Sequence, residues 1–176
     1  MSLASPFALR SATPDDVPVI LACIRGLAEY EKLPHEVTAT EALLHETLFG
    51  ARPAAETILA HRGEDPAGFA LFFHNYSTFL ARPGVYLEDL FVFPRYRGLG
   101  LGRVLLARLA QIALDRGCAR LEWSVLDWNV DAIRFYESVG AKAMTEWTVN
   151  RVTGDALRAL AASSGQRDGD TARSAG

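Results

Sequence analysis

The stretch YLEDLFVFPRYRGLGLG, residues 86–102, decides the fold, because a strand pattern changes there into a helix start through a glycine-rich loop. Its first half is aromatic and β-branched, and Pro94 ends that run. Gly98, Gly100 and Gly102 then alternate, and apolar residues follow at helical spacing. The stretch therefore predicts a strand, a tight loop and a long helix in direct succession.

The glycine loop fits neither of the two common nucleotide-binding patterns. A dinucleotide fold needs G-x-G-x-x-G, and a P-loop needs Lys-Ser or Lys-Thr after its last glycine, where this chain has Arg103 and Val104. A plain turn using glycine for positive φ angles is the simplest alternative. The three glycines flanked by Arg97 and Arg103 at a helix N-terminus favour a cradle for a pyrophosphate instead.

Composition limits the class of protein to an ordinary globular one. The 176 residues are 49% hydrophobic and 22% charged, with a formal net charge of −3, so nucleic acid is a poor candidate for the main partner. We found neither a leader pattern nor eighteen consecutive apolar residues, and expect a cytoplasmic protein without membrane contact. Cys23 and Cys118 have no metal or redox spacing and read as buried apolar residues.

Hydrophobic periodicity and capping residues predict an α/β (α+β) fold in one domain over 1–163, followed by a disordered tail over 164–176. The expected elements are a strand over 7–10, helices over 13–30 and 38–50, a meander of strands over 56–62, 68–76 and 84–93, a helix over 102–117, a strand over 119–126, a helix over 127–140, a strand over 141–152 and a helix over 154–161. This order gives a mixed, mostly antiparallel sheet with helices on both faces, in which the long helix joins two parallel neighbours.

The glycine loop also resembles a known family. RGLGLG fits the R-x-x-G-x-G pattern by which the GNAT superfamily of N-acetyltransferases holds the pyrophosphate of acetyl-coenzyme A. Together with VLDWNVDAIRFYESVGA, residues 125–141, it is similar to the spermidine/spermine (diamine) and thialysine acetyltransferase branch. The resemblance covers about residues 7–161, more loosely at LAEYEK and EWTVNRVTGDALRALA. It implies a GNAT fold whose central parallel strands splay apart, with the pantetheine arm in the gap.

The resemblance implies which residues hold acetyl-CoA, the expected co-substrate, and it implies no metal. They are Leu90, Phe91, Val92, Arg97, Gly98, Leu99, Gly100, Leu101, Gly102, Arg103, Asn129 and Ala132. Asn129 also suits the N-cap of the helix that follows it, which by itself explains the residue. Backbone N–H groups near Phe91 and Val92 would stabilise the oxyanion of the acyl transfer.

Amide formation requires a neutral amine, and an alkylamine with a pKa near about 10.4 is almost fully protonated at neutral pH. Glu88 and Asp89 are candidates for the proton acceptor, although two acids in a strand are as readily explained by a solvated edge or a bulge. On a regular strand they point to opposite faces, so only one faces the cleft. The resemblance favours Glu88 as the base, through water, with both acids near the substrate amine.

Tyr136 is the candidate for protonating the departing thiolate. A tyrosine in an apolar helix is more often a packing residue, but a phenol can donate a proton to a thiolate, and by resemblance this position is the general acid. Cys23 and Cys118 are read as structural, so direct transfer in a ternary complex is expected in place of an acetyl-cysteine. The four histidines have no ligand spacing and read as surface or packing residues.

The acceptor amine is the least defined part of the prediction. By resemblance Tyr30 and Glu31 line the amine channel and Glu146 helps to close it, while the acids at the end of the first helix are otherwise an ordinary solvated helix end. Thr78 stands where the spermidine enzymes carry an aspartate, which favours a shorter amine, or an amino acid side chain, over long polyamines. A homodimer is expected from the resemblance alone.

The sequence therefore predicts an acetyl-CoA-dependent N-acetyltransferase for the primary amine of a small molecule, such as a diamine, a polyamine or a thialysine- or lysine-like amino acid. Two alternatives stay open at this point. The acceptor could be a peptide, a protein or a xenobiotic amine, or the chain could be a coenzyme A-binding sensor without catalysis. The intact set of Glu88, Asn129 and Tyr136 speaks against the sensor.

Overall fold

The computed structural model describes residues 5–163. The chain divides into two compact units, one ending at Val139 and the other beginning at Gly140. The tail predicted for 164–176 lies outside the described residues, and the single domain over 1–163 stays a prediction. Among the residues described, no helix is both long and apolar enough to cross a membrane.

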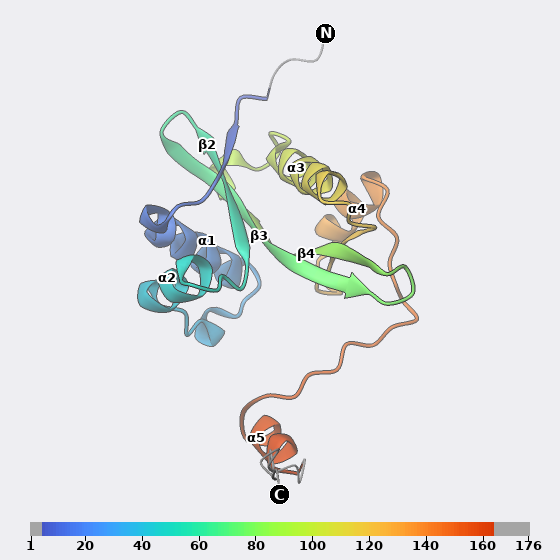
Figure 1. Cartoon of the computed structure of the whole chain (residues 1–176). Helices are drawn as coiled ribbons and strands as arrows, with labels where there is room; N and C mark the ends of the chain where they lie inside the picture. The colour runs from blue at the N-terminus through green and yellow to red at the C-terminus, as the bar shows by residue number, and fades with distance from the viewer. Residues whose placement is uncertain (1–4, 164–176) are drawn as a thin grey trace, which may run out of the picture. The chain divides into compact units, whose positions relative to one another are not determined.

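The first unit contains a five-stranded mixed sheet (Figure 1). Its strands are β1 (Ala8–Ser11), β2 (Glu56–Arg62), β3 (Asp65–Ser77), β4 (Arg82–Val92) and β5 (Leu121–Trp123), and they lie in the order β1-β2-β3-β4-β5. The first four strands are antiparallel to their neighbours, and β5 is parallel to β4. The predicted meander and the predicted parallel pair are both confirmed. The strand expected over 119–126 is shorter than predicted.

Helices cover both faces of this sheet, as predicted. The α-helices are α1 (Val17–Tyr30), α2 (Glu41–Phe49), α3 (Leu101–Asp115), α4 (Val130–Ser138) and, in the second unit, α5 (Gly154–Ala162), and single 3₁₀ turns are found at Pro14–Asp16, Pro34–Glu36 and Pro94–Tyr96. One core cluster lies between the sheet and α1 with α2, and another lies between the sheet and α3. The two clusters hold β4 in place from both sides.

The start of α1 follows the capping residues predicted from the sequence. Asp16 accepts hydrogen bonds from the backbone N–H of Thr13 at 2.7 Å and from its hydroxyl at 2.9 Å. Arg10 donates two further bonds to the same carboxylate, at 2.6 and 2.7 Å. Arg10 and these bonds hold the pKa of Asp16 far below its usual range. The network fixes β1 to the beginning of the helix.

β4 carries a β-bulge next to the predicted acidic pair. Leu87 pairs with Phe72 and Asp89 pairs with Leu71, so Glu88 is the additional residue on β4. An extra residue shifts the alternation of side chains along the strand by one position. The sequence left a bulge open as one explanation of two acids in this strand, and the structure has such a bulge at Glu88.

The parallel pairing of β4 and β5 is short. Only Val85, Tyr86 and Leu87 have partners on β5, so the strands part where the bulge begins. The antiparallel ladder with β3 continues to Val92. Beyond Leu87 the edge of β4 that faces β5 is therefore open, as the resemblance implied for two splayed strands.

The second unit contains α5 and otherwise irregular chain between 140 and 163. The strand predicted over 141–152 is wrong, because the structure has only a turn and coil there. Its apolar side chains stay exposed, with Trp147 at 73% and Val149 at 78%. A strand needs a neighbouring strand for its backbone groups, and among the described residues no strand pairs with this segment. The helix predicted over 154–161 is confirmed as α5.

Candidate active site

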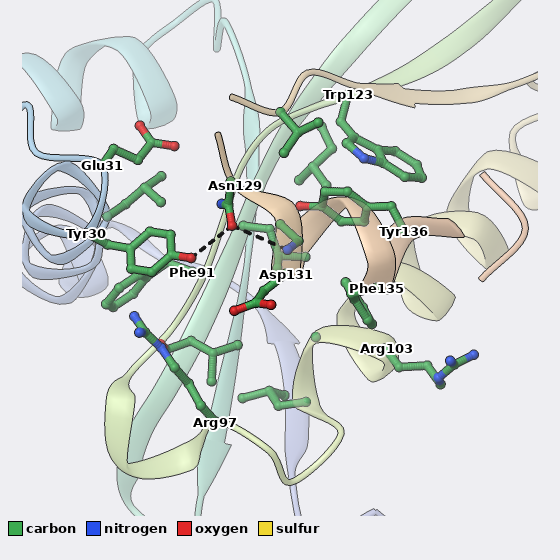
Figure 2. A pocket seen from close by; sticks show the side chains of 18 of the residues that line it. Tyr30, Glu31, Phe91, Arg97, Arg103, Trp123, Asn129, Asp131, Phe135 and Tyr136 are labelled. Carbon is green, nitrogen blue, oxygen red and sulfur yellow. Dashed lines mark hydrogen bonds between the residues drawn. The ribbon is translucent and has the colours of Figure 1, made fainter. Parts of the chain in front are cut away.

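A pocket of about 570 Å³ opens in the first unit where β4 and β5 part. It is bounded by β4 and β5, by the C-terminal end of α1, by the glycine loop with the start of α3, and by α4 (Figure 2). The predicted site residues that line it are Tyr30, Glu31, Glu88, Leu90, Phe91, Val92, Arg97, Gly98, Gly100, Leu101, Gly102, Arg103, Asn129, Ala132 and Tyr136. The structure thus brings together residues from three distant segments of the sequence, 30–31, 88–103 and 129–136.

Three predicted site residues are not part of this lining. Asp89 is half-buried next to it, and Leu99 points outward with 49% of its surface exposed. Glu146 belongs to the second unit, and its role stays a prediction. Conversely, sequence reasoning gave no site role to Leu27, Leu87, Tyr96, Ser124, Val125, Asp131 or Phe135, which line the pocket. Most of these are apolar side chains at helical or strand spacing, which a sequence cannot distinguish from core.

The glycine loop has the geometry of an anion cradle. Gly98 and Gly100 have φ angles of 74° and 82°, which residues with a side chain adopt only at a cost. The first intrahelical bond of α3 runs from Val104 N–H to Gly100 O at 3.2 Å. The backbone N–H groups that precede it in the first turn have no acceptor within the helix. Together with the helix dipole they favour an anion.

The two arginines beside this loop are held by protein groups. Arg97 donates from Nε to the carbonyl oxygen of Val92 at 3.0 Å, and its guanidinium lies 4.9 Å from the ring centre of Tyr30. Arg103 donates to the hydroxyl of Ser138 at 3.1 Å and extends away from Arg97 (Figure 2). Arg97 lines the pocket between β4 and α1, and its charge lies beside the ring of Tyr30.

The open edge of β4 presents backbone groups of alternate residues. Phe93 N–H donates to Ala67 O at 3.0 Å, which directs the odd-numbered residues here toward β3. Leu90 and Val92 therefore direct their N–H and C=O groups to the opposite, open edge. The bond from Arg97 to the Val92 carbonyl agrees with this direction. Of the two N–H groups expected to bind an oxyanion, that of Val92 faces the pocket, and the second to do so is Leu90 in place of Phe91.

Tyr136 lies on α4 with its hydroxyl directed into the pocket (Figure 2). Its ring packs against Trp123, with ring centres 5.0 Å apart, and against Phe135 at 5.3 Å. Burial raises the pKa of the phenol, and Glu31 and Tyr30 add to the effect. The hydroxyl therefore stays protonated at neutral pH and can serve as a proton donor.

Besides Asp131, which lines the pocket at the start of α4, three acids of different character face this region. Glu88 is exposed and lines the pocket from the bulge. Burial, followed by the charges of Glu88 and Glu31, raises the pKa of Asp89 to about 6. Burial also raises the pKa of Glu31, which lies opposite Tyr136 (Figure 2). The arrangement forms a negative field that suits a cationic amine.

Tyr30 connects the end of α1 to the start of α4. Its hydroxyl donates to Asn129 Oδ1 at 3.0 Å, and the same oxygen accepts the N-capping bond from Ala132 N–H at 3.3 Å (Figure 2). The predicted N-cap role of Asn129 is thus present in the structure. Because Asn129 begins the helix that carries Tyr136, this bond links the side of the pocket formed by α1 to the side formed by α4.

Comparisons with known proteins agree on one family. The family model described as acetyltransferase (GNAT) matches residues 24–141. The chain is 39% identical over 197 residues to the L-ornithine N5-acetyltransferase NATA1 of Arabidopsis thaliana, covering 86% of each chain. It is 38% identical to the thialysine N-epsilon-acetyltransferase of Mus musculus, covering 87% of this chain and 96% of that one.

The fold is also similar to solved structures. One is an integron cassette protein from the mobile metagenome of V. cholerae, with a TM-score of 0.75 and 26% sequence identity. It covers 89% of this chain and 98% of the cassette protein. This likeness extends over more of the chain than the pocket alone.

Proposed function

The chain belongs to the acetyltransferase (GNAT) family of enzymes, which use acetyl-CoA as acetyl donor, and we propose that it acetylates the primary amine of a short amino acid or diamine. The similarity to ornithine and thialysine acetyltransferases supports this class of acceptor. The observation that carries the proposal is the pocket itself. It joins an anion cradle, an open strand edge and a protonated phenol to a group of acids.

The residues present fit the donor. The first turn of α3 and the left-handed Gly98 and Gly100 supply N–H groups for the pyrophosphate, and the gap between β4 and β5 accommodates an extended arm. When bound, acetyl-CoA supplies a thioester whose carbonyl carbon accepts an amine. In this proposal, the backbone N–H groups of Leu90 and Val92 bind the carbonyl oxygen as its charge develops.

Two side chains move the protons. Glu88, directly or through water, takes a proton from the incoming ammonium, so that a lone pair is free to form the C–N bond. Tyr136 gives its proton to the sulfur as the C–S bond breaks, because a phenol held in its protonated form is a suitable donor to a thiolate. The second proton that the attacking nitrogen loses then restores the phenol. Cys23 and Cys118 are both buried, which favours direct transfer in a ternary complex.

The proposal extends to the state of the protein. Both cysteines are free thiols, which is typical of a reducing compartment and supports a cytoplasmic location. The homodimer rests on the family resemblance, and light scattering during gel filtration tests it. A mass of one chain would contradict this part of the proposal without affecting the chemistry.

The activity is tested by thiol release from acetyl-CoA with thialysine, lysine, ornithine, putrescine, spermidine and spermine. We expect turnover with the short amines, and we expect Glu88→Gln to lower the rate mainly at low pH, where the amine is most protonated. Equal rates for the two proteins across the pH range would remove Glu88 as the base. Tight acetyl-CoA binding without turnover of any amine would favour a peptide acceptor or a coenzyme A sensor.

A further inference from the structure

The C-terminal end of α1 presents two opposite charges in succession beside the pocket, of which Glu31 lines it. Glu31 is half-buried. Lys32 follows it with a φ angle of 63°, in the left-handed region that residues other than glycine seldom occupy. This is the C′ position of a Schellman motif, in which Leu33 N–H donates to Ala28 O at 2.8 Å and Lys32 N–H donates to Glu29 O at 3.2 Å, so the conformation serves to end α1. The end of α1 therefore carries two consecutive residues of opposite charge.

Lys32 contacts the ring of Trp128, and although neither residue lines the pocket, each is adjacent in sequence to one that does. Its Nζ lies 5.4 Å from the ring centre of Trp128, the residue directly before Asn129. The ring of Trp128 also packs against Tyr30, with ring centres 6.1 Å apart. A cation over an indole face keeps its position while its N–H groups stay free for a ligand. The ammonium of Lys32 is therefore fixed beside the loop that leads into α4.

Neither charge is neutralised by the protein. The ion pairs of the described residues are Arg10–Asp16, His35–Glu36, Arg116–Glu56, Arg120–Glu122 and Arg158–Asp155, none of which includes Glu31 or Lys32. Glu31 is half-buried, and Lys32 is fixed on a ring. Side chains that give up conformational freedom or hydration without a counter-ion are prepared for a charged ligand.

We propose that Glu31 and Lys32 bind the α-ammonium and the α-carboxylate of the acceptor, which makes the substrate an α-amino acid with a side-chain amine. This inference rests on the proposed function and narrows it. Glu31 lies across the pocket from Tyr136, so an amino acid held by its head group at α1 directs its side chain toward the reacting groups (Figure 2). Glu31 acts electrostatically on both Tyr136 and Asp89, which agrees with this placement.

The charges of the neighbouring acids also explain why binding of a substrate carboxylate here needs a lysine. Glu31, Glu88 and Asp89 give the amine side of the site a negative field, which would repel a substrate carboxylate. One fixed ammonium beside the pocket offsets that repulsion and forms a charge-assisted hydrogen bond. The same ammonium repels the far end of a diamine, so it selects against the decarboxylated analogue.

The test compares two pairs of amines that differ only in the carboxylate: ornithine with putrescine, and lysine with cadaverine. We expect Lys32→Gln to raise KM for ornithine and lysine roughly tenfold, as for loss of a charged hydrogen bond, with putrescine and cadaverine unchanged or improved. Lys32→Arg keeps the charge and should keep the preference. Glu31→Gln should raise KM for all four amines, because every one carries a second ammonium.

Arg25→Gln is the matched control, because it removes an exposed positive charge from the same helix. The inference is overturned if Lys32→Gln changes KM equally for both members of a pair, changes neither, or does no more than Arg25→Gln.

Calorimetric binding of ornithine in the presence of coenzyme A separates the two proposals. Binding that weakens in Lys32→Gln without any turnover would contradict the proposed function and support this inference. Neither binding nor turnover of any of the four amines would contradict both.

Discussion

The two edges of β4 differ in how far they are paired with neighbouring strands. The edge toward β3 is paired from Arg82 to Val92 except at the bulge residue Glu88, while the edge toward β5 is paired only from Val85 to Leu87. The longer ladder saturates most backbone groups on its edge and holds the strand between the two core clusters. The interrupted ladder leaves backbone groups unsaturated beside a pocket. One strand thus supplies rigidity along one edge and binding groups along the other.

The largest effect should be a difference in kcat between variants of two tyrosines, which lie on either side of the point where β4 and β5 part. Tyr136 faces the open part, and we expect Tyr136→Phe to lower kcat about 100-fold or more, because the proton donor to sulfur is removed. Tyr86 lies where β4 is still paired on both edges, and its hydroxyl contacts Ser124 at 2.7 Å.

Steady-state thiol release measures the difference, with Tyr86→Phe as the control of identical chemistry. A similar loss of kcat in both variants would remove Tyr136 as a specific proton donor.

The next effect concerns the backbone of β4 directly. Replacing the amide N–H of Leu90 by an ester oxygen, through incorporation of the α-hydroxy acid, removes a donor on the open edge. We expect kcat to fall roughly 100-fold with little change in Tm, by analogy with loss of one oxyanion donor. The same replacement at Phe91 removes a ladder bond to β3 and should lower Tm by several degrees.

Kinetics and thermal unfolding of the two esters distinguish the edges. If the Phe91 ester loses more activity than the Leu90 ester, the assignment of the two edges is inverted.

A smaller effect separates two glycines of the cradle. Gly100 has a positive φ angle, so Gly100→Ala should destabilise the fold by about 1 kcal/mol. Gly102 is helical, and a Cβ there would lie 3.4 Å from the ring of Phe135, an ordinary contact. Gly102→Ala should leave Tm unchanged or slightly higher and raise KM for acetyl-CoA about tenfold, because the new methyl group obstructs the pyrophosphate.

Thermal unfolding and KM together decide between strain and obstruction. An unchanged KM for acetyl-CoA in Gly102→Ala would show that the donor does not approach this turn.

The smallest effect is one of stability. Asp89 pairs with β3 through its backbone, yet the pKa of its carboxyl is raised to about 6 from 3.8. The folded state therefore binds the proton more tightly than the unfolded state, and stability falls as pH rises through this interval. Asp89→Asn should raise Tm by a few degrees at about pH 8 and leave it nearly unchanged at about pH 4.

Thermal unfolding at the two pH values measures this effect. An equal shift at both would show that packing, and not ionisation, is responsible.

Local signals in the sequence were sufficient for most of the fold. The capping residues Thr13 and Asp16, and the turn from strand to helix at Gly100, act over a few residues and do not depend on distant partners. The strand pattern over 56–93 likewise predicts the antiparallel meander of β2, β3 and β4 without reference to distant residues. These elements appear where the pattern predicts them.

Features that depend on contacts between distant segments escaped prediction. The pattern over 141–152 is that of a strand, but a strand exists only where an edge accepts it, and no edge does so among the described residues. The bulge at Glu88 is a property of pairing with β3, and the acidic pair alone could give it only as one of several alternatives. The direction of Arg97 toward Tyr30 and Val92 depends on where α1 ends.

The bulge at Glu88 has a consequence for how this protein can vary over evolutionary time. Substitutions on β4 alter one contact at a time, but deletion of one residue there would change the phase of everything that follows. Leu90 and Val92 would exchange sides with Phe91, in both side chain and backbone. The number of residues in this segment is therefore more tightly constrained than their identity. A lineage that changes this number must alter the strand and the pocket together.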